Sequence, residues 1–175
     1  GADKARLDWE GRPLVRHIAD ALAPLCGRVL VAAGADPGRL TDLGLELVAD
    51  AVAGLGPLEG LRAGLAAAPG DQVFTTPCDV PHLDTHLVHR LLVGLRTAEA
   101  AVAVHPQGRR EPLLAAYRRI PALAAATAAL ARGERKAAAI LAGLHTVEVP
   151  MDDATWYRNL TTPDDYRQAR EAHAC

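Results

Sequence analysis

The feature that most constrains the fold of this chain is a repeated alternation between short apolar runs and segments with helical periodicity. Apolar runs at 28–33, 45–49, 72–76 and 100–104 predict buried strands, and helical patterns lie between most of them. Strands that alternate with helices are usually joined by right-handed crossovers. This order therefore predicts an α/β fold with a largely parallel sheet and helices on both faces.

The helical segments have recognisable starts. Pro13 is suited to a first helical turn, and the apolar residues after it predict a helix over 13–24. Small residues recur every four positions from Pro57 onward, which predicts a helix that packs closely against the sheet. Asp84 is a natural N-cap for a helix that runs to about residue 96.

The alternation changes in the second half of the chain. A turn cluster at 105–110 separates two apolar runs, so we expect 113–117 to return antiparallel to 100–104 within a mixed sheet. The other predicted elements are two helices, an edge strand and a terminal helix, at 121–132, 136–142, 145–149 and 163–172. No repeat or linker divides the 175 residues, so we expect one domain, residues 1–175.

Charge and cysteine patterns exclude several classes of protein. The net charge is −2 and both signs are interspersed, so the chain has no electrostatic footprint for a nucleic acid polymer. No apolar run is long enough to span a membrane. Cys26, Cys78 and Cys175 lie far apart, which argues against a disulfide framework and favours a cytoplasmic location. The chain has no serine, which excludes a serine nucleophile.

A carboxylate follows one predicted strand directly. Strand 72–76 leads into Pro77-Cys78-Asp79, at the edge of an open α/β sheet where ligands bind. A carboxylate there can hold Mg²⁺, which takes few protein ligands and keeps waters and substrate phosphates. Asp79 is therefore our candidate metal ligand. The alternative is a loop aspartate that caps the next turn.

Other polar residues are weaker candidates when they are taken singly. Asp50 ends strand 45–49 and precedes a glycine-rich loop that opens a helix, where backbone N–H groups suit an anion or a base edge. Lys4 lies where a lysine can reach phosphate, and Arg135 and Lys136 form a basic pair at a helix start. A tight turn would be the more usual explanation of the glycine-rich loop after Asp50. Solvated surface charges would be the more usual explanation of Lys4, Arg135 and Lys136.

A set of short motifs occurs in order along the chain. The motifs are Gly1-x-Asp3-Lys4, Gly11-Arg12-Pro13-Leu14, Asp50, Gly56-Pro57-Leu58-x-Gly60, Cys78-Asp79-x-Pro81, Gly133-Glu134-Arg135 and Asn159-x-x-Thr162-Pro163. Their order and spacing resemble the molybdenum cofactor guanylyltransferase family along essentially the whole chain. Each motif is short, and their joint occurrence is far more specific than any one of them.

This resemblance implies a Rossmann-like three-layer nucleotidyltransferase fold, with a mostly parallel sheet that contains one antiparallel strand. It implies the Mg²⁺-dependent transfer of GMP from GTP to the terminal phosphate of molybdopterin, with release of pyrophosphate. The partners would be GTP and molybdopterin. Other proteins of molybdenum cofactor biosynthesis would be partners too, because a labile pterin favours direct handover.

The resemblance also implies roles for individual residues. Lys4 looks like the catalytic lysine that contacts the GTP phosphates, Asp50 like the nucleotide-binding aspartate and Asp79 like the catalytic Mg²⁺ ligand. The positions that the resemblance assigns to substrate binding, on or near the pterin side, are Gly56, Gly60, Arg135 and Asn159.

The sequence departs from the family pattern in places. The family's opening strand and the glycine-rich loop that wraps the triphosphate would lie before Gly1, so we expect both to lie outside this sequence. The asparagine that the family often carries near the guanine is missing from the stretch Ala32-Ala33-Gly34-Ala35. A second asparagine, in the family's C-terminal motif, is replaced here by Thr161. Two alternatives therefore stay open, a related cytidylyl- or sugar-phosphate nucleotidyltransferase and a catalytically silent nucleotide-binding protein.

Overall fold

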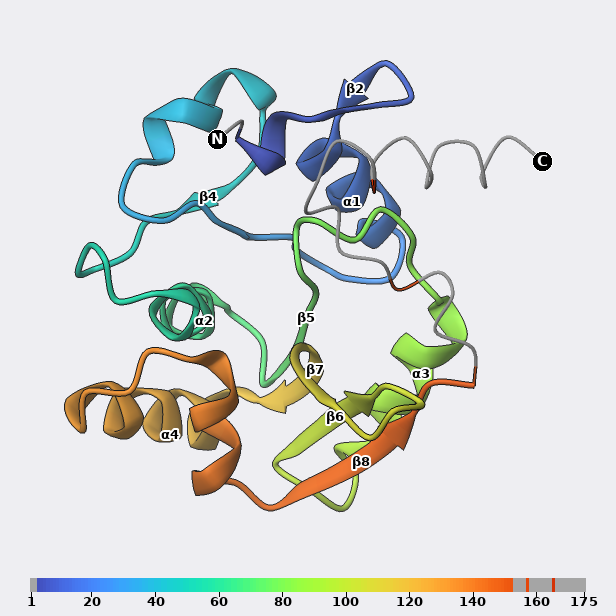
Figure 1. Ribbon diagram of the computed structural model, residues 1–175, viewed down its shortest axis with the longest axis vertical. Coiled ribbons are helices and arrows are strands. Elements are labelled where there is room, and N and C mark those ends of the chain that lie inside the picture. Colours follow the sequence, from blue (N-terminus) through green and yellow to red (C-terminus); the bar gives the residue numbers. More distant parts are fainter. Residues whose placement is uncertain (1–2, 153–156, 158–164, 166–175) are drawn as a thin grey trace.

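The computed structural model describes residues 3–152, 157 and 165 of the chain (Figure 1). Its α-helices are α1 (Leu14–Leu22), α2 (Pro57–Ala67), α3 (Thr85–Gly94) and α4 (Arg119–Ala131), and its 3₁₀ helices are η1 (Lys4–Arg6), η2 (Pro37–Leu43) and η3 (Ala137–Gly143). Its strands are β1 (Asp8–Trp9), β2 (Arg12–Pro13), β3 (Val31–Ala32), β4 (Leu47–Val48), β5 (Gln72–Thr75), β6 (Ala100–Val104), β7 (Arg110–Arg118) and β8 (Thr146–Pro150). None of the helices in this described part is long and apolar enough to cross a bilayer.

The principal sheet is mixed, with the strand order β5-β7-β6-β8. Strand β7 runs antiparallel to both β5 and β6, whereas β8 pairs parallel with β6. The expected antiparallel return at 113–117 is therefore confirmed, and the strand that makes it extends over Arg110–Arg118. The predicted edge strand at 145–149 is confirmed as β8.

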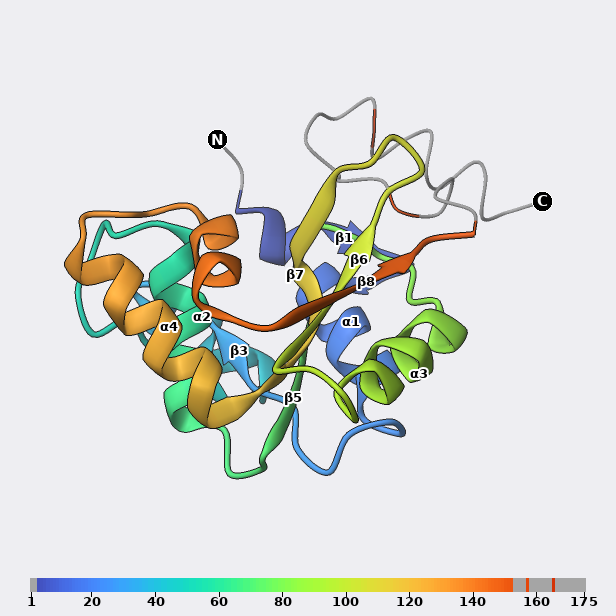
Figure 2. The same cartoon turned by 90° about the horizontal axis from the view of Figure 1, so that it is seen from below.

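Alternating residues of β6 and β7 face two different layers of helices. One face, with Val102 and Tyr117, packs against α2, α4 and η3. The other face, with Ala101 and Leu114, packs against α3. Figure 2 shows α2 and α4 on one side of the strands and α1 and α3 on the other. The predicted α/β architecture with helices on both faces is thus confirmed.

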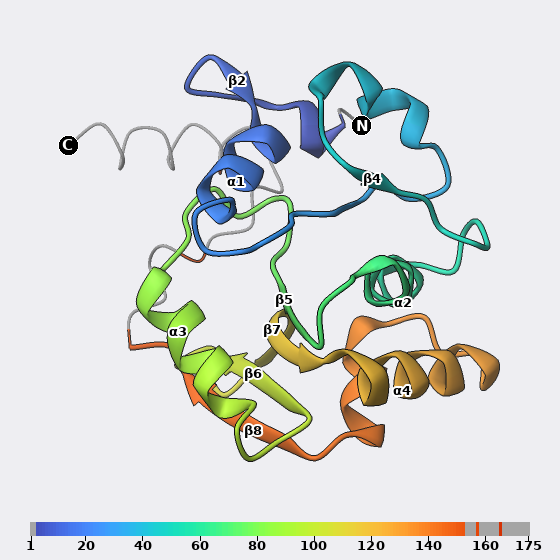
Figure 3. The same cartoon turned by 180° about the vertical axis from the view of Figure 1, so that it is seen from behind.

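A second, smaller sheet contains only β3 and β4, which pair in parallel (Figure 3). Both are shorter than the predicted strands at 28–33 and 45–49. Within the described residues, β4 is the only strand that pairs with β3. The length of each strand is therefore set by how far these two segments stay paired. Apolar periodicity predicts that a segment is extended and buried, whereas the length of a ladder depends on its partner.

The helices largely follow the sequence. Helix α3 begins at its predicted cap, because the Asp84 carboxylate accepts hydrogen bonds from the backbone N–H groups of His86 at 2.9 Å and Leu87 at 3.2 Å. The segment predicted as a helix over 136–142 is the 3₁₀ helix η3, since seven residues are too few for the apolar pattern to separate a period of 3.0 from 3.6. The predicted terminal helix at 163–172 lies outside the described residues, apart from Asp165.

Candidate functional site

Asp79 lies in the loop that follows β5, and this loop is held from two sides. The Val80 side chain is buried in the core cluster that contains α3 and one face of the principal sheet. On the other side, Nε2 of His17 from α1 lies 3.0 Å from the carbonyl oxygen of Pro81. The Asp79 carboxylate is 18% exposed, so it is positioned by the scaffold and still accessible to a ligand.

The structure brings Lys4 to Asp79. The Lys4 ammonium donates a hydrogen bond to Oδ2 of Asp79 over 3.0 Å, although the two residues are 75 positions apart. Lys4 starts the short helix η1, which is capped by Asp3: its carboxylate accepts from the N–H of Ala5 and also pairs with Arg39. The backbone that carries Lys4 is therefore fixed, and the ammonium is free to turn toward phosphate.

Asp50 follows β4 and carries an oxygen atom that has no protein partner. Its backbone N–H bonds to the carbonyl of Gly34 at 2.9 Å, which fixes the residue beside β3. Oδ1 is buried and accepts no hydrogen bond from the described residues. Burial, reinforced by the negative charge of Glu59, raises the pKa of the Asp50 carboxyl. An N–H donor from a ligand would satisfy this oxygen.

Gly60 explains how α2 comes so close to Asp50. A Cβ atom at Gly60 would lie 3.8 Å from Oδ1 of Asp50 and 3.7 Å from Cβ of Ala32. Any larger side chain at Gly60 would occupy the space in front of this carboxylate. Gly60 and Asp50 therefore belong to one small region, although the sequence motifs identified them only as two separate positions.

Glu59 is a functional candidate that the sequence analysis missed. Its side chain is nearly inaccessible, and the carboxylate accepts hydrogen bonds from the N–H of Ala51 at 2.9 Å and from Arg62 at 2.7 and 2.8 Å. The hydrogen bond from Ala51 fixes the first residue after Asp50 to helix α2, and Arg62 holds the Glu59 carboxylate in place. Its trace in the sequence is a glutamate and an arginine three positions apart, on a helix made otherwise of small and apolar residues.

Gly56 and Arg135 meet through their backbones. Gly56 has φ +74° and ψ −168°, a region that is essentially restricted to glycine. A Cβ atom there would lie 3.1 Å from the carbonyl oxygen of Arg135, and the same carbonyl accepts from the N–H of Leu58 at 3.2 Å. The Arg135 guanidinium is exposed and donates to the carbonyl of Glu134 at 2.8 Å.

A cavity of about 300 Å³ lies beside Asp79, and we call it the Asp79 cavity. It is lined by Pro57, Pro77, Asp79, Glu111, Pro112, Leu113, Lys136, Ala137, Ala138 and Tyr157. Glu111 accepts from the Tyr157 hydroxyl at 3.2 Å and from Nε of Arg109 at 2.5 Å. Burial and the adjacent Glu111 raise the pKa of Tyr157, so this hydroxyl stays protonated. The cavity thus combines apolar walls with a few charged groups.

The predicted site residues fall into pairs. Lys4 contacts Asp79, Gly60 lies against Asp50, and Gly56 contacts Arg135. The last two pairs are connected through the start of α2, which Gly56 caps and which contains Gly60. Asn159 lies outside the described residues.

No group of three or more histidine, cysteine, aspartate or glutamate side chains is arranged to hold a metal ion within the described part of the chain. His82, near Asp79, packs edge-on against the buried Trp9 with ring centroids 5.6 Å apart. A metal in this site would therefore depend on Asp79 together with oxygens that a substrate supplies. This is the ligand set that suits Mg²⁺.

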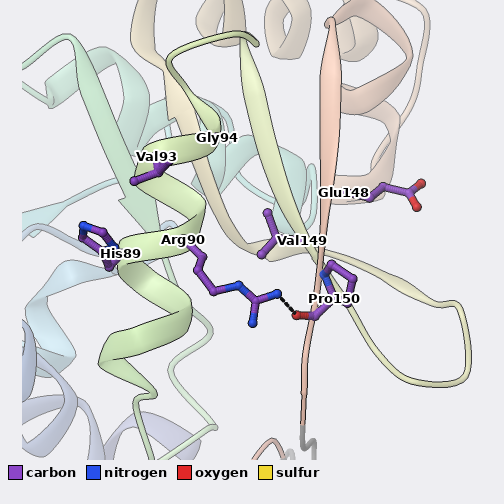
Figure 4. Close-up of a pocket in the computed structure, with 7 residues that line it drawn as sticks. All are labelled: His89, Arg90, Val93, Gly94, Glu148, Val149 and Pro150. Atoms are coloured by element: carbon purple, nitrogen blue, oxygen red, sulfur yellow. Dashed lines mark hydrogen bonds between the residues drawn. The ribbon is translucent and has the colours of Figure 1, made fainter.

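A larger surface hollow of about 460 Å³ lies between α3 and β8 (Figure 4). The Arg90 guanidinium is engaged there, by the carbonyl of Pro150 at 2.8 Å and by Asp152 at 2.6 Å. Figure 4 shows the side chains of His89 and Glu148 pointing away from each other. Within the described residues, the lining of this hollow brings no set of free polar groups together.

Comparison with protein families gives a match to the MobA-like NTP transferase domain over residues 1–149. Among curated proteins, the molybdenum cofactor guanylyltransferase of Shewanella piezotolerans is 31% identical over 176 aligned residues, which cover 99% of this chain and 86% of that protein. The enzyme of the same name from Pseudomonas fluorescens is 37% identical over 169 residues, covering 93% of this chain and 82% of the relative.

Solved structures show the same fold. The molybdopterin-guanine dinucleotide biosynthesis protein A of Archaeoglobus fulgidus superposes with a TM-score of 0.80 at 22% identity and covers 99% of this chain and 92% of its own. The 2-C-methyl-D-erythritol 4-phosphate cytidylyltransferase of Thermus thermophilus superposes with a TM-score of 0.78 at 21% identity, covering 98% and 94%. The predicted Rossmann-like nucleotidyltransferase fold is therefore confirmed.

Proposed function

The chain belongs to the MobA-like NTP transferase family, and from this membership we propose that it transfers GMP from GTP to the terminal phosphate of molybdopterin. An oxygen of the acceptor phosphate attacks the α-phosphorus of GTP. The bond from this phosphorus to the bridging α-β oxygen breaks, and its electron pair leaves with pyrophosphate. Because the attacking phosphate is already ionised, the reaction needs positioning and charge neutralisation more than it needs a strong base.

The pairing of Lys4 with Asp79 is the observation that carries this proposal. Asp79 is the carboxylate that would hold Mg²⁺, and the ion would neutralise charge on the GTP phosphates. With Asp79 so engaged, the Lys4 ammonium would lose its 3.0 Å partner and would turn to the triphosphate. A lysine suits this movement because its point charge sits on a flexible stem.

Asp50 would recognise the base. Its buried Oδ1 has no hydrogen-bond partner among the described residues, and guanine presents an N1–H and an exocyclic N2–H₂ on one edge. A carboxylate can accept from both of these donors. Cytosine offers only its exocyclic N4–H₂ group as a donor on the corresponding edge. This difference favours guanine and explains how a base could be chosen without an asparagine at 32–35.

The acceptor would enter through the Asp79 cavity. Gly56 and Arg135 form the backbone junction next to this cavity, since their neighbours Pro57 and Lys136 both line it. We include Asn159 on the acceptor side because it matches the family's motif. The proposed reaction uses nucleotides of the cytoplasm, where neighbouring enzymes of molybdenum cofactor biosynthesis would receive the product.

A comparison of three nucleotides, each tested separately, tests the proposal. Purified full-length protein is heated with Mg²⁺ and with GTP, CTP or UTP, and pyrophosphate release is then measured with molybdopterin. We expect stabilisation and turnover with GTP. A preference for CTP would favour a cytidylyltransferase related to the Thermus enzyme, and binding of GTP without turnover would favour a silent nucleotide-binding protein.

A further inference from the structure

The chain contains only two lysines, Lys4 and Lys136, among its 19 lysines and arginines. Both lie at the same site. Lys4 contacts the Asp79 carboxylate, and Lys136 lines the cavity that Asp79 also lines. In a chain that otherwise uses arginine for positive charge, one lysine contacts this carboxylate and the other lines the cavity beside it. Lysine differs from arginine in being a compact, rotatable point charge.

Lys136 is the charged residue of the Asp79 cavity for which the described residues supply no partner. The carboxylate of Asp79 is paired with Lys4, and Glu111 is paired with Arg109 and bonded to Tyr157. For Lys136, the described part of the chain supplies neither an ion pair nor a hydrogen bond to its ammonium, which is solvent-exposed at the cavity wall. An anion that enters the cavity therefore meets a cation that is not already neutralised.

The backbone that carries Lys136 is held on both sides. Before it, the carbonyl of Arg135 accepts from Leu58 at the start of α2. After it, Ala137 and Ile140 of η3 are buried against the core. The Cα of Lys136 is thus fixed relative to α2, while the side chain can turn. This is the arrangement expected for a residue that positions a bound group.

We propose that Lys136 binds the phosphate monoester of the acceptor, while Lys4 serves the triphosphate of GTP. This inference rests on the proposed guanylyl transfer. A phosphate monoester carries a charge of roughly −1.5 to −2 at neutral pH, and it must approach a triphosphate of the same sign. A separate cation bound to each substrate reduces the electrostatic repulsion between the two phosphate groups. Pro57, Pro112 and Leu113 supply apolar walls for the ring system that bears the phosphate.

Steady-state kinetics with full-length Lys136→Gln and Lys136→Arg protein test this inference. For Lys136→Gln, the loss of one charge-assisted hydrogen bond should raise the KM for molybdopterin by roughly 10- to 100-fold. The KM for GTP should not change. Lys136→Arg keeps the charge and should retain most of the acceptor affinity. The matched control is Arg132→Gln, which removes one charge from an exposed position of the same connection and outside the cavity lining.

The outcomes separate this inference from the proposed function. If the unmodified protein transfers GMP and Lys136→Gln leaves the acceptor KM unchanged, the assignment of Lys136 is wrong and guanylyl transfer stands. An equal rise in both KM values would also overturn the assignment, because it would indicate a general structural effect. If the unmodified protein releases no pyrophosphate with GTP and molybdopterin, the proposed function itself fails.

Lysine footprinting gives a second readout that does not depend on turnover. The protein is treated with an amine-selective acetylating reagent, and the peptides that contain Lys4 and Lys136 are quantified by mass spectrometry. Molybdopterin should slow acetylation of Lys136 and leave Lys4 unprotected, whereas GTP with Mg²⁺ should protect Lys4. Equal reactivity of Lys136 with and without molybdopterin would contradict the inference.

Discussion

The ammonium of Lys4 lies 3.0 Å from the carboxylate of Asp79, across 75 residues of sequence. Each group neutralises the other in the absence of substrate. With 42% of the lysine side chain exposed, the pair contributes little to stability and can be exchanged for other partners. A cation at the carboxylate and a triphosphate at the ammonium would replace this one ion pair by two contacts between opposite charges.

Asp79→Asn is expected to lower the rate of GTP-dependent pyrophosphate release by roughly 100-fold or more, because it removes the charge that would hold the metal at the reacting phosphates. The apparent affinity for Mg²⁺ should fall with it, and the melting temperature should change little. The control is Asp71→Asn. Asp71 precedes the first residue of β5, at the opposite end of the strand, and pairs with Arg118. Its substitution should leave the rate unchanged, and an active Asp79→Asn protein would remove Asp79 from the metal role.

Asp50→Asn is expected to stabilise the ligand-free protein and to weaken GTP binding. The pKa of Asp50 is raised by burial and by Glu59, so the ionised carboxylate destabilises the folded state. Loss of the charged acceptor should reduce the affinity for GTP by roughly 10- to 100-fold. Calorimetric titration with GTP and a thermal melt would measure the two effects.

The stability difference at Asp50 should depend on pH. A carboxyl whose pKa is raised by folding binds a proton more readily in the folded state, so its destabilising effect is complete above the folded pKa. The effect fades as the pH falls and disappears below the unfolded pKa of about 3.9. The advantage of Asp50→Asn should therefore shrink from neutral to acid pH. An advantage that grew on acidification would contradict this sign.

Glu59→Gln is expected to lower the free energy of unfolding at neutral pH by about 2–3 kcal/mol, since it breaks a buried ion pair and leaves Arg62 without its counter-charge. Arg62 lowers the pKa of Glu59, so this stabilisation is present above the ordinary pKa and is lost as the pH falls through the lower folded value. Urea unfolding of both proteins at several pH values measures this stabilisation and its pH dependence. Glu46→Gln, in the exposed pair with Arg28, should show no comparable loss.

Gly56→Ala is expected to destabilise the protein by about 2–3 kcal/mol, because its backbone region is restricted to glycine and the added Cβ presses on the Arg135 carbonyl. Gly54→Ala is the matched comparison. Gly54 also has a positive φ, of 77°, but nothing lies within 4 Å of its missing Cβ. Gly54→Ala should lower the free energy of unfolding by about 1 kcal/mol. The KM for the acceptor should rise only for the Gly56 variant. Equal losses in thermal melts would show that the Arg135 contact contributes nothing.

Local patterns predicted most elements of the fold. The strand at 100–104 and the helix capped by Asp84 have the expected positions, because short apolar runs and capping residues act over a few neighbours. The antiparallel return at 113–117 was also predictable from the turn cluster before it. The short β3–β4 sheet and the 3₁₀ geometry of η3 were not, because both depend on what packs beside them.

The residues of the candidate site were predictable from the sequence, but their positions relative to one another were predictable only in part. The position of Asp79 directly after a strand followed from chain order alone, and the ordered motifs identified the family. Glu59 escaped notice because a buried glutamate and an exposed one look alike in sequence. Its burial follows from the close approach of α2 to Asp50, which a glycine at position 60 permits.

Short-range chemistry is encoded in the residues themselves: where strands and helices start, which carboxylate ends a strand, and which motifs recur in order. Contacts between distant segments exist only once the chain has folded. The meeting of Lys4 with Asp79, the unpartnered oxygen of Asp50 and the approach of Lys136 to the Asp79 cavity all belong to this second kind. The reason is physical, since side-chain charges act over a few ångströms in space and sequence separation does not set those distances.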